Sequence, residues 1–165
     1  TTSFTYLGRD NNKYFSNNLN ITEWLKQYSK EQDDAYVRGF LGRMLFSGDE
    51  SLKKVKVLSG GEKVRCMLSK MMLTGANVLI LDDPTNHLDL EAIESLNQAL
   101  VSFPGVILFT SHDHEFIQTV ANRIVEITPK GVIDRMMPFD DYMADEQIKE
   151  LRKQCYEGSD RKIKF

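Results

Sequence analysis

A run of four apolar residues that ends in two carboxylates constrains the fold of this chain more than any other feature. The run extends from Val78 to Leu81, and Asp82 and Asp83 follow it directly. Short and continuously apolar segments are typical of strands buried on both faces of a parallel sheet. In such sheets ligands bind at the carboxyl ends of the strands. The pattern therefore predicts an α/β fold with a parallel sheet, and magnesium and water chemistry at its edge.

A glycine pair upstream of this strand predicts a phosphate-binding helix terminus. Gly60 and Gly61 follow Ser59 and open an amphipathic helical pattern that ends at Gly75. The first N–H groups of a helix are unpaired and lie at the positive end of its dipole, so they attract anions. A glycine pair alone serves loop geometry as often as phosphate binding. The acidic strand end that follows favours nucleotide phosphate as the ligand.

The sequence lacks the loop that usually cradles a nucleotide's phosphates. None of its ten glycines begins the pattern Gly-x-x-x-x-Gly-Lys-[Ser/Thr]. We therefore expect that this chain does not hold a nucleotide by itself.

Composition predicts one soluble, globular, cytoplasmic domain. The chain has 165 residues, of which 41% are apolar and 27% charged. No apolar stretch approaches the roughly 20 residues that span a bilayer, and the N-terminus lacks signal-peptide character. A formal net charge of −3 argues against a broad nucleic-acid surface. Cys66 and Cys155 lack metal-ligand spacing and are predicted to be reduced, while the basic cluster from Arg161 to Lys164 is interpreted as a solvated tail.

Hydrophobic periodicity and capping residues predict an order of helices and strands that includes a β-α-β unit. Asn20 and Glu23 form the pattern of a capping box at the first helix. The charged residues from Lys149 to Lys153, Arg152 among them, are interpreted as the exposed face of the last helix. The predicted strands are 4–7, 78–82, 106–110, 123–127 and 132–135, and the predicted helices are 21–28, 33–46, 62–75, 90–101, 114–121 and 140–156.

Together these motifs resemble the nucleotide-binding domain of ATP-binding-cassette proteins. The resemblance rests, in order, on Leu58 to Glu62, Asp82, the turn from Asn86 to Asp89, and Ser111 to Asp113. It covers essentially the whole chain. It implies a P-loop NTPase-like domain fragment with a helical and signature region at about 20–75, a core at 76–139 and a C-terminal helix and tail at 140–165.

Three segments further resemble the second cassette of the F subfamily, which consists of soluble twin-cassette ATPases, many of which act on the ribosome. These segments are Leu41 to Phe46, Val57 to Arg65 and Pro84 to Glu91. The resemblance implies ATP and Mg²⁺ as cofactors and a companion cassette that supplies a P-loop. It also implies the ribosome as a partner of the full-length protein.

The resemblance implies a role for each matching residue. Asp82 matches the Walker B aspartate, which holds magnesium, usually through water; Asp89 matches the D-loop aspartate at the dimer seam; and His112 matches the switch histidine, which touches the γ-phosphate. The signature motif, which contacts the γ-phosphate of a nucleotide held by the opposite cassette, is matched by Ser59, Gly60 and Gly61, with Glu62 beside them. His87 and His114 are interpreted as structural or exposed residues.

Two positions depart from the family pattern. Asp83 stands where the family usually has a catalytic glutamate, and it is one methylene shorter. A base set back by about 1 Å can cost on the order of a hundredfold in rate. Arg9 stands where the family has its loop glutamine, and a guanidinium accepts no hydrogen bond and coordinates no magnesium. The departures predict slow hydrolysis, or a cassette that mainly senses nucleotide.

The leading hypothesis is therefore an ATP-hydrolysing cassette of an F-type protein, present here without its P-loop and catalytically silent as a separate piece. One alternative is the nucleotide-binding subunit of a membrane transporter. Another is a non-catalytic dimerisation or interaction module. If strands upstream are missing, apolar surface should be exposed and the isolated chain is expected to self-associate.

Overall fold

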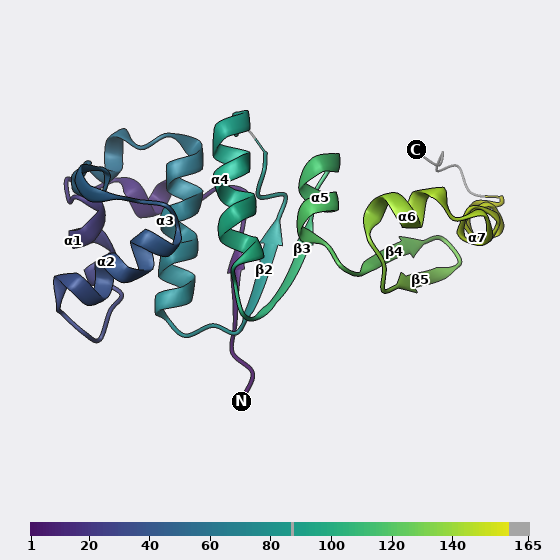
Figure 1. Cartoon of the computed structure of the whole chain (residues 1–165), viewed down its shortest axis with the longest axis horizontal. Coiled ribbons are helices and arrows are strands. Elements are labelled where there is room, and N and C mark those ends of the chain that lie inside the picture. The colour runs from purple at the N-terminus through teal and green to yellow at the C-terminus, as the bar shows by residue number, and fades with distance from the viewer. Residues whose placement is uncertain (87, 159–165) are drawn as a thin grey trace. The chain divides into compact units, whose positions relative to one another are not determined.

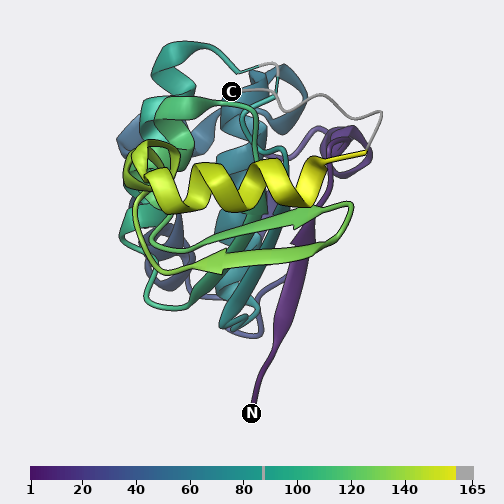
Figure 2. The ribbon, with the colours of Figure 1, turned by 90° about the vertical axis from the view of Figure 1, so that its right-hand side faces the viewer.

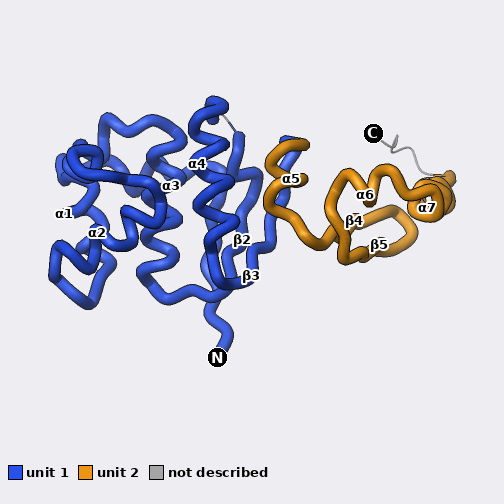
Figure 3. The backbone as a smooth tube through the Cα atoms, viewed as in Figure 1, with its two compact units in different colours: residues 1–113 blue, residues 114–165 orange. Residues whose placement is uncertain are grey.

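The computed structural model describes residues 1–86 and 88–158 and divides into two compact units, residues 1–113 and 114–165 (Figure 3). His87 and the basic cluster from Arg161 to Lys164 lie outside the described residues. The predicted α/β class is confirmed, because the first unit contains a parallel sheet with packed helices (Figure 1). No helix within the described ranges is long and apolar enough to cross a membrane.

The sheet of the first unit consists of three parallel strands in the order β1-β2-β3. The strands are β1 (Phe4–Leu7), β2 (Val78–Asp82) and β3 (Val106–Thr110), with the bounds that the sequence predicts. Because the strands are parallel and in register, the segments that follow them emerge at the same edge of the sheet.

Four α-helices belong to this unit, and side chains cap their N-termini. They are α1 (Ile21–Lys26), α2 (Asp34–Arg43), α3 (Gly60–Leu73) and α4 (Leu90–Val101), accompanied by the 3₁₀ turns η1 (Asn12–Phe15), η2 (Gly48–Leu52) and η3 (Val55–Val57). The predicted capping box of Asn20 and Glu23 is confirmed. A second box, of Ser59 and Glu62, starts α3 two residues earlier than predicted.

The helices α3 and α4 lie on one side of the strands (Figure 1), and the core forms between them and one face of the sheet. Leu79 and Leu81 of β2 are buried there, together with Met67 and Met71 of α3. The other face of the sheet carries apolar side chains, several of them exposed. Its exposed side chains are Phe4 (70%), Tyr6 (57%), Val106 (62%) and Leu108 (58%). Such an exposed apolar surface is what the sequence predicts for a sheet that lacks upstream strands.

The second unit consists of α5 (His114–Val120), the hairpin of β4 (Ile124–Thr128) and β5 (Gly131–Arg135), α6 (Phe139–Ala144) and α7 (Glu146–Tyr156). Figure 2 shows α7 lying along the hairpin. Its small core contains Ile133, Tyr142 and Ile148. The prediction of one final helix over 140–156 is wrong. The helix is interrupted at Asp145. The carboxylate of Asp145 accepts hydrogen bonds from the N–H groups of Gln147 and Ile148 and so caps the start of a new helix.

Two side chains lie elsewhere than the periodicity predicts. Arg152 was expected on the exposed face of the last helix, but only 6% of it is exposed and its Nε lies 2.8 Å from a carboxylate oxygen of Glu126. Leu45 lies within the predicted amphipathic helix 33–46, on the side of its apolar stripe, but it is 41% exposed and has a φ of 62°, because α2 ends at Arg43. Cys66 and Cys155 are free thiols, as predicted.

Candidate functional site

The carboxylate of Asp82 is the centre of the candidate site at the carboxyl edge of the sheet. One of its oxygens lies 3.4 Å from a guanidinium nitrogen of Arg9 and accepts a hydrogen bond from the Thr110 hydroxyl at 3.2 Å. The other oxygen accepts from the Tyr6 hydroxyl at 3.3 Å. The carboxylate side chain is 35% exposed. The site thus presents a half-exposed anion at the end of β2, held by donors from the two flanking strands, β1 and β3, and from the segment after β1.

Asp83 holds an unusual backbone conformation at the same edge. Its φ is 51°, a left-handed value that aspartate tolerates better than most residues with a side chain. Its N–H donates to the carbonyl oxygen of Thr110 at 3.0 Å, which ties the end of β2 to the end of β3. Strained conformations of this kind cost on the order of 1–3 kcal/mol and cluster at functional sites.

The segment after β3 brings His112 to this edge. Ser111, directly before it, shares a hydrogen bond of 3.2 Å with the hydroxyl of Thr85 and accepts one of 3.0 Å from the N–H of Asp113. The imidazole of His112 is exposed. The carboxyl ends of three neighbouring strands therefore bring together Arg9, Asp82, Asp83 and the segment of His112, as the parallel topology predicts.

The signature residues form the start of α3 in this chain. The hydroxyl of Ser59 accepts a hydrogen bond from the N–H of Glu62 at 3.3 Å, and Glu62 accepts one from the N–H of Ser59 at 2.8 Å. The ammonium group of Lys53 lies 2.7 Å from the other oxygen of Glu62. Burial alone would raise the pKa of Glu62, but the hydrogen bonds from Lys53 and the Ser59 backbone outweigh it and lower that pKa. Both oxygens of Glu62 are thus engaged within the chain.

The start of α3 contacts the start of α4 through Gly61. A Cβ atom at Gly61 would lie 2.3 Å from the Cβ of Ala92, which is far inside contact distance. Asp89 caps α4 by accepting a hydrogen bond from the N–H of Ala92 at 2.8 Å. The contact therefore joins the signature motif and the segment that follows the predicted D-loop. Among the described residues, no hydrogen bond or ion pair links Ser59 or Glu62 to Asp82 or Asp83.

Sequence reasoning missed three residues that shape the site. Tyr6 and Thr110 donate to Asp82, and Lys53 pairs with Glu62. The positions of Tyr6 and Thr110 near the carboxyl ends of predicted parallel strands were a usable signal, since Asp82 ends the strand between them. No local pattern marks Lys53.

The oxygen atoms at this edge fit a magnesium ion that also binds a nucleotide. Mg²⁺ is usually held by one or two carboxylates together with phosphate oxygens and water. Asp82 supplies such a carboxylate, with the Thr110 hydroxyl beside it. Within residues 1–86 and 88–158 no group of three or more His, Cys, Asp or Glu side chains is arranged to hold a metal ion. The residues thus fit a metal whose other ligands come from the nucleotide and solvent.

Comparisons to known proteins agree with the fold. A family model described as "ABC transporter" matches residues 5–86. The structure is similar to that of a metal-chelate type ABC transporter in an inward-facing conformation, with a TM-score of 0.67 and 13% identity over 92% of this chain and 63% of that one. At this identity the likeness concerns the fold. The chain belongs to the family of ATP-binding-cassette domains.

Within this family the chain groups with the F members. The uncharacterized ABC transporter ATP-binding protein YkpA of Bacillus subtilis is 58% identical over 94% of this chain and 29% of its own length. ABC transporter F family member 5 of Arabidopsis thaliana is 37% identical over 72% of this chain and 18% of its own length. The energy-dependent translational throttle protein EttA of Escherichia coli K12 is 40% identical over 59% of this chain and 18% of its own length. The chain spans less than a third of each relative.

Proposed function

We propose that this chain is part of an ATP-binding and ATP-hydrolysing cassette of an F-type protein. In that protein Asp82 would hold Mg²⁺, usually through water, Asp83 would stand in the position of the catalytic base, and His112 would contact the γ-phosphate. Ser59, Gly60 and Gly61, with Glu62, would face the nucleotide of a companion cassette across the seam that Asp89 lines. Bound Mg²⁺ would neutralise charge that develops on the phosphates.

The observation that carries this proposal is the meeting of Arg9, Asp82, Asp83 and the segment of His112 at one edge of a parallel sheet. The open apolar face of the same sheet supports it further, because parallel sheets are normally covered on both faces. The covering layer would come from the part of the cassette that carries the P-loop. The cassette would then close around ATP. The relative named a translational throttle suggests a role in translation, and the ribosome is the partner that this proposal expects.

Calorimetric titration with MgATP tests the proposal. We expect no binding to the 165-residue chain and binding to a version extended upstream through the nearest Gly-x-x-x-x-Gly-Lys motif of the parent protein. Asp82→Ala in the extended version should remove the magnesium dependence of that binding. Tight binding of MgATP by the 165-residue chain alone would refute the proposal.

Arg9→Gln should raise the affinity of the extended version for Mg²⁺. The guanidinium of Arg9 lies 3.4 Å from the carboxylate that would meet the metal, so Mg²⁺ must compete with it. The pair is exposed (60% for Arg9), and such pairs contribute about 0–1 kcal/mol, so the Mg²⁺ concentration at half-saturation should fall by up to about fivefold. Mn²⁺ binding followed by electron paramagnetic resonance measures this without relying on turnover.

Arg43→Gln is the matched control, because the guanidinium of Arg43 lies over the Phe40 ring in α2 and the described structure shows no ion pair for it. An unchanged metal affinity in Arg9→Gln would mean that Arg9 leaves Asp82 when the nucleotide binds. The free energy of unfolding of Arg9→Gln should stay within about 0.5 kcal/mol of the wild-type value.

A further inference from the structure

Lys70 carries a positive charge that no carboxylate neutralises among the residues that the structure describes. Its ammonium nitrogen lies 4.2 Å from the ring centroid of Tyr14 in η1 and 4.2 Å from that of Tyr28 after α1. Burial, and secondarily the charge of Lys13, lower the pKa of Lys70. The lysines of the nearby pairs Lys26–Asp34 and Lys53–Glu62 have carboxylate partners, whereas Lys70 has two aromatic rings.

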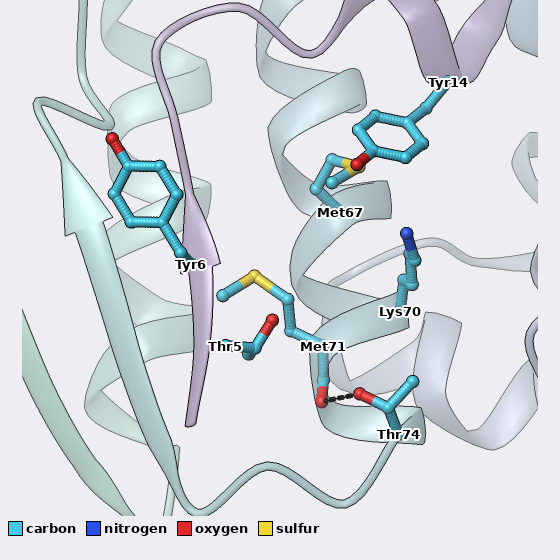
Figure 4. A pocket seen from close by; sticks show the side chains of 7 residues that line it. All are labelled: Thr5, Tyr6, Tyr14, Met67, Lys70, Met71 and Thr74. Atoms are coloured by element: carbon cyan, nitrogen blue, oxygen red, sulfur yellow. Dashed lines mark hydrogen bonds between the residues drawn. The ribbon is translucent and has the colours of Figure 1, made fainter. Parts of the chain in front are cut away.

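A hollow of about 140 Å³ adjoins this lysine. It lies between β1, η1 and α3, and Figure 4 shows Tyr14 and the Lys70 ammonium on the side opposite the strand. Thr5 and Tyr14 contribute hydroxyl groups for which the described structure shows no hydrogen-bond partner. The Thr74 hydroxyl is already used, because it donates to the carbonyl oxygen of Met71 at 2.8 Å. The hollow thus offers one ammonium group and two free hydroxyls.

Two more lysines add positive charge around η1. The ammonium of Lys13 lies 5.2 Å from the Tyr14 ring centroid. Lys63 donates to the side-chain oxygen of Asn12 at 3.0 Å, a neutral partner. The described residues show no ion pair between a carboxylate and Lys13, Lys63 or Lys70. The surroundings of the hollow therefore favour an anion over a cation or a neutral ligand.

We propose that this hollow is a phosphate-binding site, in which Lys70 supplies the charge and Tyr14 and Thr5 supply hydrogen bonds. An ammonium group and two hydroxyls that line one small hollow suit the multiple acceptor oxygens of a phosphate group. The site is distinct from the Asp82 edge, and it does not depend on the proposed ATPase activity. Its ligand is either a free phosphate or a phosphodiester of single-stranded RNA.

Titration of the 165-residue chain with inorganic phosphate and, separately, with a single-stranded RNA hexamer tests this site. We expect a dissociation constant for phosphate on the order of 1 mM. Lys70→Met should weaken binding at least about tenfold, since it removes a charged hydrogen-bond donor. Lys30→Met, which changes an exposed lysine in the loop after α1, should leave the affinity unchanged. If the chain binds the RNA but not free phosphate, and Lys70→Met loses that binding, the ligand is a phosphodiester of RNA.

Nuclear magnetic resonance titration of Lys70 gives an independent readout, because a bound anion should raise its pKa. If circular dichroism shows that Lys70→Met is unfolded, the double variant Thr5→Val/Tyr14→Phe decides, since it keeps the ammonium and the rings and removes only the hydroxyls. Unchanged affinity in a folded Lys70→Met or in the double variant would overturn the proposal. So would the absence of binding of both ligands to the wild-type chain.

Discussion

Glu126→Ala should unfold the hairpin-and-helix part of the second unit at temperatures where the first unit stays folded. The carboxylate of Glu126 accepts hydrogen bonds from the hydroxyls of Tyr142 at 2.6 Å and Tyr156 at 2.9 Å, and it pairs with Arg152 at 2.8 Å. The side chain of Arg152 is only 8% exposed, so the variant removes a carboxylate partner from a buried guanidinium. Removing one partner of a buried pair costs about 3–5 kcal/mol. Hydrogen exchange of the amides in residues 124–156 measures this loss locally.

The matched control is Glu150→Ala, which removes a carboxylate from α7, the helix that carries Arg152. Its partner Lys153 is 70% exposed and the pair spans 3.5 Å, so the effect should stay within about 0.5 kcal/mol. Burial raises the pKa of Tyr142, and the hydrogen bond to Glu126 raises it further, so the tyrosine stays neutral and donates at physiological pH. If the amides of residues 124–156 exchange at the same rates in Glu126→Ala and Glu150→Ala, the contacts of Glu126 do not stabilise this unit.

The sequence predicts regular elements well where a single physical signal dominates. The bounds of β2, β3 and α4 match the prediction to the residue, because an unbroken apolar run or an amphipathic stripe sits between clear capping residues. The break at Asp145 was missed because the helical pattern continues on both sides of it. Arg152 was misplaced because its partner Glu126 lies 26 residues away on a strand, and periodicity carries no information about such pairs.

The sequence predicts which residues meet at the candidate site, but it does not predict the contacts between them. Motif spacing and the parallel topology place Asp82, Asp83 and His112 at one edge. The ion pair between Arg9 and Asp82 depends on the register of β1 against β2, which a local pattern does not contain. The left-handed conformation of Asp83 likewise occurs where its N–H bonds to Thr110 on a strand 27 residues away, which a local pattern does not contain. The roles of these residues toward ATP stay predictions.

Gly61→Ala should destabilise the first unit by about 1–3 kcal/mol, the usual cost of overpacking a close contact. In an open helical position the same change would stabilise, because alanine favours the helix by about 1 kcal/mol over glycine. The added Cβ would lie 2.3 Å from the Cβ of Ala92, so α3 and α4 must move apart or distort. The unfolding midpoint should therefore fall by about 2–4 °C for each kcal/mol lost, as measured by circular dichroism.

A second substitution separates the packing role of Gly61 from any role in binding phosphate. Ala92→Gly removes the atom that a Cβ at position 61 would meet, so Gly61→Ala/Ala92→Gly should regain stability, with a coupling of at least about 1 kcal/mol between the two changes. Gly42→Ala, in α2, is the matched control: a Cβ there meets no atom within 4 Å, and the change should stabilise by about 0.4–1 kcal/mol. In the extended version, a double variant that folds but no longer supports nucleotide binding between cassettes would show that the glycine also serves the ligand. Restored binding would leave close packing of α3 on α4 as the reason for glycine at this position.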